Sequence, residues 1–178
     1  NEASGAFSAF PKEAGIAAAA LGDGDMSLVR SFAKVMGEEW HSIGLRGMYG
    51  YMADLATEPR WYRVHETFTE DADLAANIMK TLVENLQGGP LNPKSPVALT
   101  MKHFPGGGPQ ELGLDPHYAF GKNQVYPAGN FGWHLKPWKA AIDAGASSIM
   151  PYYGVPIGVT YEGVKYEQTG FAFSKQVV

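Results

Sequence analysis

Three short apolar runs, each preceded by a stretch with the periodicity of a helix, set the pattern of this 178-residue chain. The apolar runs span residues 47–53, 97–102 and 147–152. The helix-like stretches span residues 26–43, 72–86 and 131–144. The runs begin about 50 residues apart, which leaves room for the crossover helix that two parallel strands need. The pattern therefore predicts an α/β fold made of parallel βα units.

The ends of the predicted helices carry the expected signals. Asp71 is placed to cap the stretch 72–86, and two glycines stop it. Asp25 is placed in the same way before the first helix. Pro137 interrupts the third stretch, so we expect a fresh helical turn to begin there.

The number of units limits what the chain can form by itself. A (β/α)8 barrel needs eight βα units and about 250 residues, and only three units occur here. Three parallel strands cannot close a barrel, and an open sheet this narrow leaves its edges unpaired. We therefore expect residues 1–178 to be part of a (β/α)8 barrel within a larger protein. The alternative is a small doubly wound domain that is complete in itself.

Polar side chains follow the second predicted strand directly. The segment 97–108, VALTMKHFPGGG, runs from apolar residues into Lys102 and His103 and then into a glycine-rich turn. The carboxyl ends of parallel strands are where α/β folds bind ligands. These two residues are therefore candidates for a binding site. The alternative is that Lys102 reaches solvent and His103 satisfies a local carbonyl group.

A second apolar segment also has an acidic residue near its end. The run 48–55, MYGYMADL, contains Asp54 and leads into ATEPRWYRVHETFTEDADL at 56–74. With KHF at 102–104, this order resembles glycoside hydrolase family 3, the β-glucosidase family. Members of that family carry an acid followed by Pro-Arg-Trp-Gly-Arg, then Glu-Thr-Phe-Gly-Glu-Asp-Pro, and later Lys-His-Phe.

The resemblance also reaches FPKEAGIAAA at 10–19 and MPYYG at 150–154, so it covers most of the chain. It implies that the chain is part of the N-terminal barrel domain of a retaining β-glucosidase-like enzyme. Tyr62 and Thr69 stand where the family pattern commonly has glycine, so we expect a reshaped loop.

The resemblance also implies a set of residues that bind the hydroxyl groups of a terminal sugar. These substrate-binding candidates are Arg63, Lys102, His103, His117 and Tyr153. Arg offers a planar fork of donors, Lys offers a compact cation, and His can donate or accept.

Three nearby acids, Asp54, Glu66 and Glu70, are interpreted as partners that hold Arg63 and Lys102 in place, because crowded cations need compensating charge. A simple ion pair of Arg63 with Glu66 or Glu70 is the alternative.

No catalytic carboxyl group is assigned in this chain. The family resemblance implies a nucleophilic aspartate in an Asp-Trp motif, which does not occur before Val178, and an acid/base glutamate from a following domain. The N-acetylglucosaminidase branch instead uses an Asp-x-His element as acid/base, and Asp115-Pro116-His117 is the alternative candidate. A further alternative is a non-catalytic carbohydrate-binding module.

Composition excludes several other classes. A net charge of −4 does not indicate the basic surface that nucleic-acid binding needs, and the chain has no cysteine for disulfides or thiolate metal sites. No apolar run is long enough to span a bilayer, and we expect neither a metal nor a cofactor. The expected partners are a carbohydrate substrate and the remainder of the same enzyme. The compartment stays open, with a secreted or periplasmic location slightly favoured.

Overall fold

The computed structural model describes residues 5–178 and contains four α-helices among them. The helices are α1 (Glu13–Asp23), α2 (Ser27–Ser42), α3 (Ala72–Leu82) and α4 (Phe131–Asp143). The strands are β1 (Gly47–Met48), β2 (Ala98–Phe104), β3 (Asn123–Gln124), β4 (Ser148–Pro151), β5 (Val155–Pro156), β6 (Thr160–Tyr161) and β7 (Val164–Lys165). Shorter turns include a π-helical turn at Val83–Gln87 and 3-10 turns at Val64–Glu66, Glu111–Gly113, Ala119–Gly121 and Phe171–Phe173.

The main sheet has the order β1-β2-β4, and both of its pairings are parallel. In β2, Leu99, Met101 and His103 are buried and the residues between them are half-buried, as expected for a strand whose two faces differ. The predicted parallel wiring is therefore confirmed. The sheet remains open within the described chain, because three strands are too few to close a barrel.

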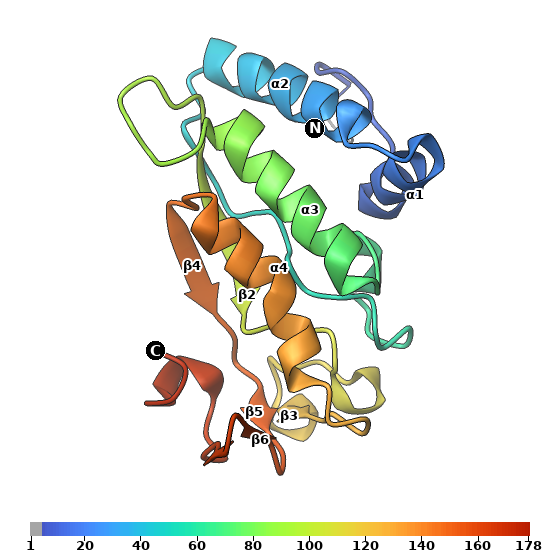
Figure 1. Ribbon diagram of the computed structural model, residues 1–178, viewed down its shortest axis with the longest axis vertical. Helices are drawn as coiled ribbons and strands as arrows, with labels where there is room; N and C mark the ends of the chain where they lie inside the picture. Colours follow the sequence, from blue (N-terminus) through green and yellow to red (C-terminus); the bar gives the residue numbers. More distant parts are fainter. Residues whose placement is uncertain (1–4) are drawn as a thin grey trace.

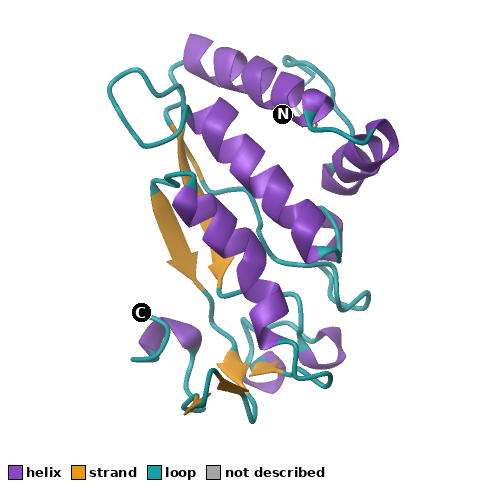
Figure 2. Cartoon of the chain, viewed as in Figure 1, coloured by secondary structure: helices purple, strands orange, loops and turns teal. Residues whose placement is uncertain are grey.

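The helices α2, α3 and α4 lie side by side on one face of this sheet (Figures 1 and 2). The core between the layers contains Ile78 and Leu82 from α3, Leu99 and Met101 from β2, and Trp138 from α4. These side chains are no more than 1% exposed. Truncating a buried Leu, Ile or Met to Ala costs about 2–5 kcal/mol, so this layer supplies much of the stability.

Gln87 holds the amino ends of β2 and β4 together. Its side-chain oxygen accepts the backbone N–H groups of Leu99 and Ser147 at 3.1 and 3.0 Å. Its side-chain nitrogen donates to the carbonyl oxygens of Gly89 and Gly145 at 2.6 and 2.7 Å. All four bonds of a fully buried amide are thus satisfied, so the start of the second and third strands is fixed.

The three predicted helices agree closely with α2, α3 and α4, with two differences in detail, whereas α1 was not predicted. The Asp71 carboxylate accepts the N–H groups of Asp73 and Leu74, as predicted for a cap. The Asp25 carboxylate accepts the N–H of Ser27, although Met26 is the capping position. The expected fresh turn at Pro137 is wrong, since α4 runs through it without a break.

The strand predicted at 47–53 is mostly irregular. Only Gly47–Met48 pairs regularly with β2, and Met52 rejoins β2 through a single bridge to Lys102. Gly50 has no side chain to pack and weakens the strand at this point. The chain still runs beside β2, so the segment after it reaches the carboxyl end of the sheet.

Residues after β4, together with β3 and the start of α4, form a small second layer beyond the carboxyl end of the main sheet. There β5 pairs with β3, and β6 pairs with β7 (Figure 1). Phe131, Tyr152 and Phe171 form the centre of a separate cluster of buried side chains. Across residues 5–178, none of the helices has the length and apolar character that crossing a membrane requires.

Candidate functional site

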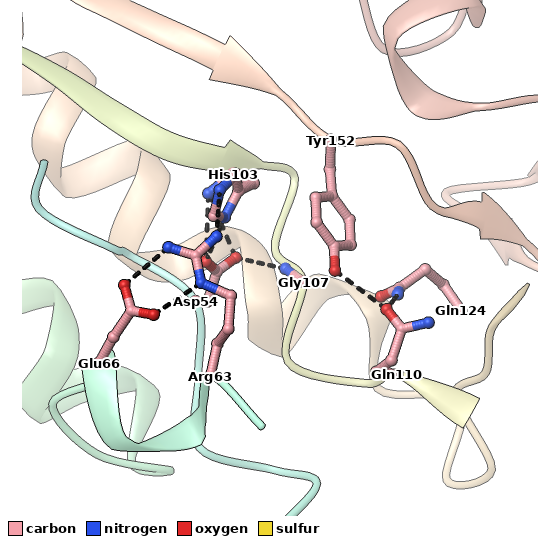
Figure 3. A network of polar contacts seen from close by, with 8 residues as sticks. All are labelled: Asp54, Arg63, Glu66, His103, Gly107, Gln110, Gln124 and Tyr152. Atoms are coloured by element: carbon pink, nitrogen blue, oxygen red, sulfur yellow. Dashed lines mark hydrogen bonds and ion pairs between the residues drawn. The ribbon is translucent and has the colours of Figure 1, made fainter. Parts of the chain in front are cut away.

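The carboxylate of Asp54 lies at the centre of a buried network at the carboxyl end of β2 (Figure 3). It accepts the backbone N–H of His103 at 3.2 Å, the Nδ1–H of the same residue at 2.9 Å, and the backbone N–H of Gly107. Three donors therefore converge on one carboxylate that is 2% exposed. This network joins the segment after β1 to the turn after β2.

His103 has both ring nitrogens occupied. Asp54 can only accept at Nδ1, and Arg63 can only donate at Nε2, where its Nη1 lies at 3.2 Å. The two partners together select the tautomer with its proton on Nδ1. The sequence interpretation gave His103 a free choice of donating or accepting toward a sugar, whereas the structure shows an imidazole that also positions Arg63.

Arg63 makes a two-pronged ion pair with Glu66. Its Nε and Nη2 lie 2.7 Å from the two carboxylate oxygens, a geometry that only a planar guanidinium permits. This contact lowers the pKa of Glu66. Glu66 is therefore ionised near neutral pH and holds the Arg63 fork in one orientation. This is also the ion pair that the sequence analysis kept open as the alternative for Arg63.

Lys102 contributes a second cation beside this pair. It lines a cavity of about 90 Å³ together with Glu13, Glu66 and residues 48–52. Within residues 5–178 its ammonium group has no hydrogen bond or ion pair. Burial and the neighbouring Arg63 charge lower the pKa of Lys102. A half-buried cation without a protein partner is available to donate to a ligand hydroxyl.

The glycine turn after β2 is required by close packing. A Cβ on Gly107 would lie 2.8 Å from the ring of Tyr152, and one on Gly108 would lie 2.1 Å from the carbonyl oxygen of Leu55. Side chains at these positions would displace the turn. The peptide bonds Gly50–Tyr51, Lys102–His103 and Phe104–Pro105 at this end of the sheet are cis.

Tyr152 and Gln110 are parts of the site that the sequence analysis did not select. The Tyr152 ring lies 5.2 Å from that of His103, and its hydroxyl donates to the Gln110 side chain at 3.0 Å. Gln124 also donates to Gln110 (Figure 3). The sequence signals for this packing are the MPYYG segment at 150–154 and the small residue required at Gly107, whereas Gln110 has no motif around it.

The remaining candidates lie outside the network around Asp54. Tyr153 is 57% exposed and its ring lies 5.2 Å from that of His117, so the tyrosine against His103 is Tyr152 and not Tyr153. His117 is exposed, with its Nδ1 2.6 Å from Asp115. Glu70 is exposed and, within the described chain, its carboxylate pairs with neither Arg63 nor Lys102, contrary to the expectation.

A parallel sheet with helices on one face and charged side chains at the carboxyl ends of its strands is the arrangement of (β/α)-barrel enzymes. Residues 2–155 match the model of the glycosyl hydrolase family 3 N terminal domain. The chain belongs to this family and forms part of its (β/α)8-type barrel. The doubly wound alternative is therefore set aside.

Individual relatives agree. Beta-glucosidase C of Emericella nidulans is 46% identical over 175 residues, which are 98% of this chain and 27% of the relative. The periplasmic beta-glucosidase/beta-xylosidase of Dickeya chrysanthemi is 36% identical over 96% of this chain and 26% of its own length. The chain thus spans about a quarter of the length of these relatives.

Solved structures show the same fold. The Listeria innocua beta-glucosidase in complex with isofagomine superposes with a TM-score of 0.72 at 28% identity, over 85% of this chain and 20% of that one. The family 3 beta-N-acetylglucosaminidase from Paenibacillus sp. gives a TM-score of 0.74 at 24% identity, over 97% of this chain and 30% of that one. At that identity the second likeness shows the fold alone.

Proposed function

We propose that this chain is the glycone-binding part of a retaining β-glucosidase-like hydrolase, which removes terminal β-linked sugars. The observation that carries the proposal is the grouping of Arg63, Lys102 and His103 at the carboxyl end of β2 in a family 3 chain. Relatives that are named β-glucosidases, and neighbours solved with laminaribiose or isofagomine, support a carbohydrate substrate.

These residues can bind adjacent hydroxyl groups of a sugar. Three of the five N–H groups of Arg63 donate to Glu66 and His103, which leaves two for a ligand, and the Lys102 ammonium has no ion pair or hydrogen bond within residues 5–178. Charged donors form hydrogen bonds worth about 1.5–3 kcal/mol, and those to the 2-hydroxyl strengthen in an oxocarbenium-like transition state. The pair therefore contributes binding and also a part of the rate enhancement. His117 and Tyr153 are proposed to contact more distant parts of the substrate.

The two carboxylates inside the site are unsuited to the catalytic steps. Asp54 is buried and already accepts three N–H donors, and Glu66 is bound at both oxygens by Arg63. A nucleophile needs a free oxygen facing the anomeric carbon, and a general acid needs a proton that the lowered pKa of Glu66 denies it. We therefore place the nucleophile and the acid/base in the rest of a longer protein, of which residues 1–178 are a partial barrel domain.

The test is kinetic and uses the longer protein that carries this chain. We expect Arg63→Ala and Lys102→Ala each to lower kcat/KM on aryl β-glucosides by about 10² to 10³, the loss of roughly 3–4 kcal/mol of transition-state binding. Lys139→Ala is the matched control, because that lysine is exposed and, among residues 5–178, pairs only with Asp143 four residues on. Full activity with unchanged KM in either site variant would remove that residue from the sugar pocket.

A further inference from the structure

Tyr152 is a buried side chain that directly follows β4 and packs on the histidine of the cation site. It is 2% exposed, and the centroid of its ring lies 5.2 Å from that of His103. Its hydroxyl group donates to the side-chain oxygen of Gln110 at 3.0 Å (Figure 3). A ring this deeply buried cannot itself touch a substrate. Any effect it has on the reaction must pass through the residues that it contacts.

Gln110 holds the Tyr152 hydroxyl in one place. This amide is 1% exposed, and its oxygen accepts both that hydroxyl and the side-chain N–H of Gln124. Its nitrogen donates to the carbonyl oxygens of Gly121 and Asn123. Both ends of the amide are therefore used, which fixes its orientation with the oxygen toward the tyrosine. Burial raises the pKa of Tyr152, so the phenol keeps the proton that it donates.

The rest of the Tyr152 side chain is held by packing. A Cβ on Gly107 would lie 2.8 Å from the ring, so the glycine turn lies directly against it. The backbone N–H of Tyr152 donates to the carbonyl oxygen of Phe104 at 2.8 Å. Within residues 5–178, the bond to Gln110 is the one hydrogen bond of the hydroxyl. A phenylalanine at this position would keep the packing and lose that restraint alone.

A continuous path leads from this ring to the proposed sugar site. The Nδ1 of His103 lies 2.9 Å from Asp54, and its Nε2 lies 3.2 Å from Nη1 of Arg63. Hydrogen bonds weaken steeply when their distance and angle change, and closely packed interiors transmit small displacements. A shift of the Tyr152 ring would therefore tilt the imidazole and change the direction of the Arg63 guanidinium.

We propose that Tyr152, anchored by Gln110, is a positioning residue that fixes the His103–Arg63 pair for the transition state. This inference rests on the proposed function. The bond from Tyr152 to Gln110 joins segments 42 residues apart, so it ties the end of β4 to the loop after β2. Donors that are already oriented stabilise developing charge without reorganisation. Losing the anchor should therefore lower kcat more than it raises KM.

The first experiment removes only the hydroxyl group, in the longer protein. We expect Tyr152→Phe to lower kcat/KM on an aryl β-glucoside about 3- to 10-fold, mainly through kcat, in line with the net worth of one hydrogen bond. Tyr126→Phe is the matched control. The Tyr126 hydroxyl is also buried, but it has no hydrogen-bond partner within the described part of the chain. This control should stay within twofold of the wild type.

The second experiment asks whether the hydroxyl acts through the proposed path. Gln110→Met removes its acceptor, and Arg63→Ala removes the group that it positions. In either background, adding Tyr152→Phe should change kcat/KM by less than twofold. A residue that only stabilises the fold would instead give the same factor in every background. The thermal midpoint should fall by the same amount when Tyr152→Phe is added with or without Arg63→Ala, because the packing of the ring is independent of that arginine.

The outcomes separate this inference from the proposed function. A loss below twofold in Tyr152→Phe, an equal loss in Tyr126→Phe, a loss confined to KM, or an unchanged factor in the Arg63→Ala background would each overturn the positioning role. None of these results affects the glucosidase assignment. If Gln110→Met does not fold, the Arg63→Ala cycle alone decides. A wild-type protein that does not hydrolyse aryl β-glucosides would overturn the proposed function, and the positioning role would fall with it.

Discussion

Replacing Asp54 with asparagine tests the centre of the site while nearly conserving its volume. Three N–H donors converge on this carboxylate, and the amide that replaces it has one oxygen, which can accept two of them. At least one buried donor then faces the NH2 group, at a cost of about 1–3 kcal/mol. The other two bonds lose their charge assistance, about 1 kcal/mol each. The sum is a loss of roughly 3–5 kcal/mol in the free energy of unfolding.

Catalysis should suffer as well, because the amide no longer fixes the tautomer of His103, on which the position of Arg63 depends. Urea unfolding and kcat/KM on an aryl β-glucoside, both in the longer protein, measure the two effects. Asp143→Asn is the matched control, since that carboxylate is exposed and its one ion pair within the described part of the chain is with Lys139. Its cost should stay below about 1 kcal/mol. An Asp54→Asn variant as stable as this control would refute the reasoning.

Three further predictions concern proton transfer. Burial and Arg63 lower the pKa of Lys102, so its ammonium group loses its proton at a lower pH than that of an ordinary lysine. The alkaline fall of kcat/KM in a pH-rate profile should therefore begin at a lower pH, and Lys102→Arg should move this fall to higher pH. Burial lowers the pKa of His134 from 6.5 to about 4, so only the unfolded chain takes up this proton between those values. The free energy of unfolding should therefore fall by roughly 3 kcal/mol as pH drops from 6.5 to 4, and His134→Gln should remove this part of the dependence in urea titrations. His117→Ala should lower the hydrolysis of aryl glucosides and of glucosides with poor leaving groups by a similar modest factor. A large loss confined to substrates with poor leaving groups would make His117 the acid/base and favour the N-acetylglucosaminidase branch.

Much of the main fold was predictable because its signals are local. Helix α3 combines a regular apolar face with the Asp71 cap, and the alternation in β2 follows from its burial on one face. Helix α1 has no such signal, since its apolar residues are mostly alanines spread around the helix. Nothing in the spacing of 47–53 indicated that only two of its residues would pair regularly.

The site was predictable where charge compensation decides it, and not where packing does. Glu66 lies three residues from Arg63, close enough for the ion pair that forms, whereas Glu70 points to solvent. Tyr152 and Tyr153 are adjacent, and the strand ends before them, so sequence alone could not say which ring turns inward. Two of the donors to Asp54 are backbone N–H groups, which leave no trace in residue identity.

That use of the backbone has an evolutionary consequence. The Asp54 carboxylate accepts hydrogen bonds from the main-chain N–H groups of residues 103 and 107. The start of the following loop is therefore fixed in a way that does not depend on the side chains further along the loop. We therefore expect the exposed side chains of residues 111–121 to tolerate substitution without disturbing the network around Asp54. The exposed Tyr118–Phe120 stack lies in this stretch, so the surface of the loop can change while the main-chain path at its start stays the same.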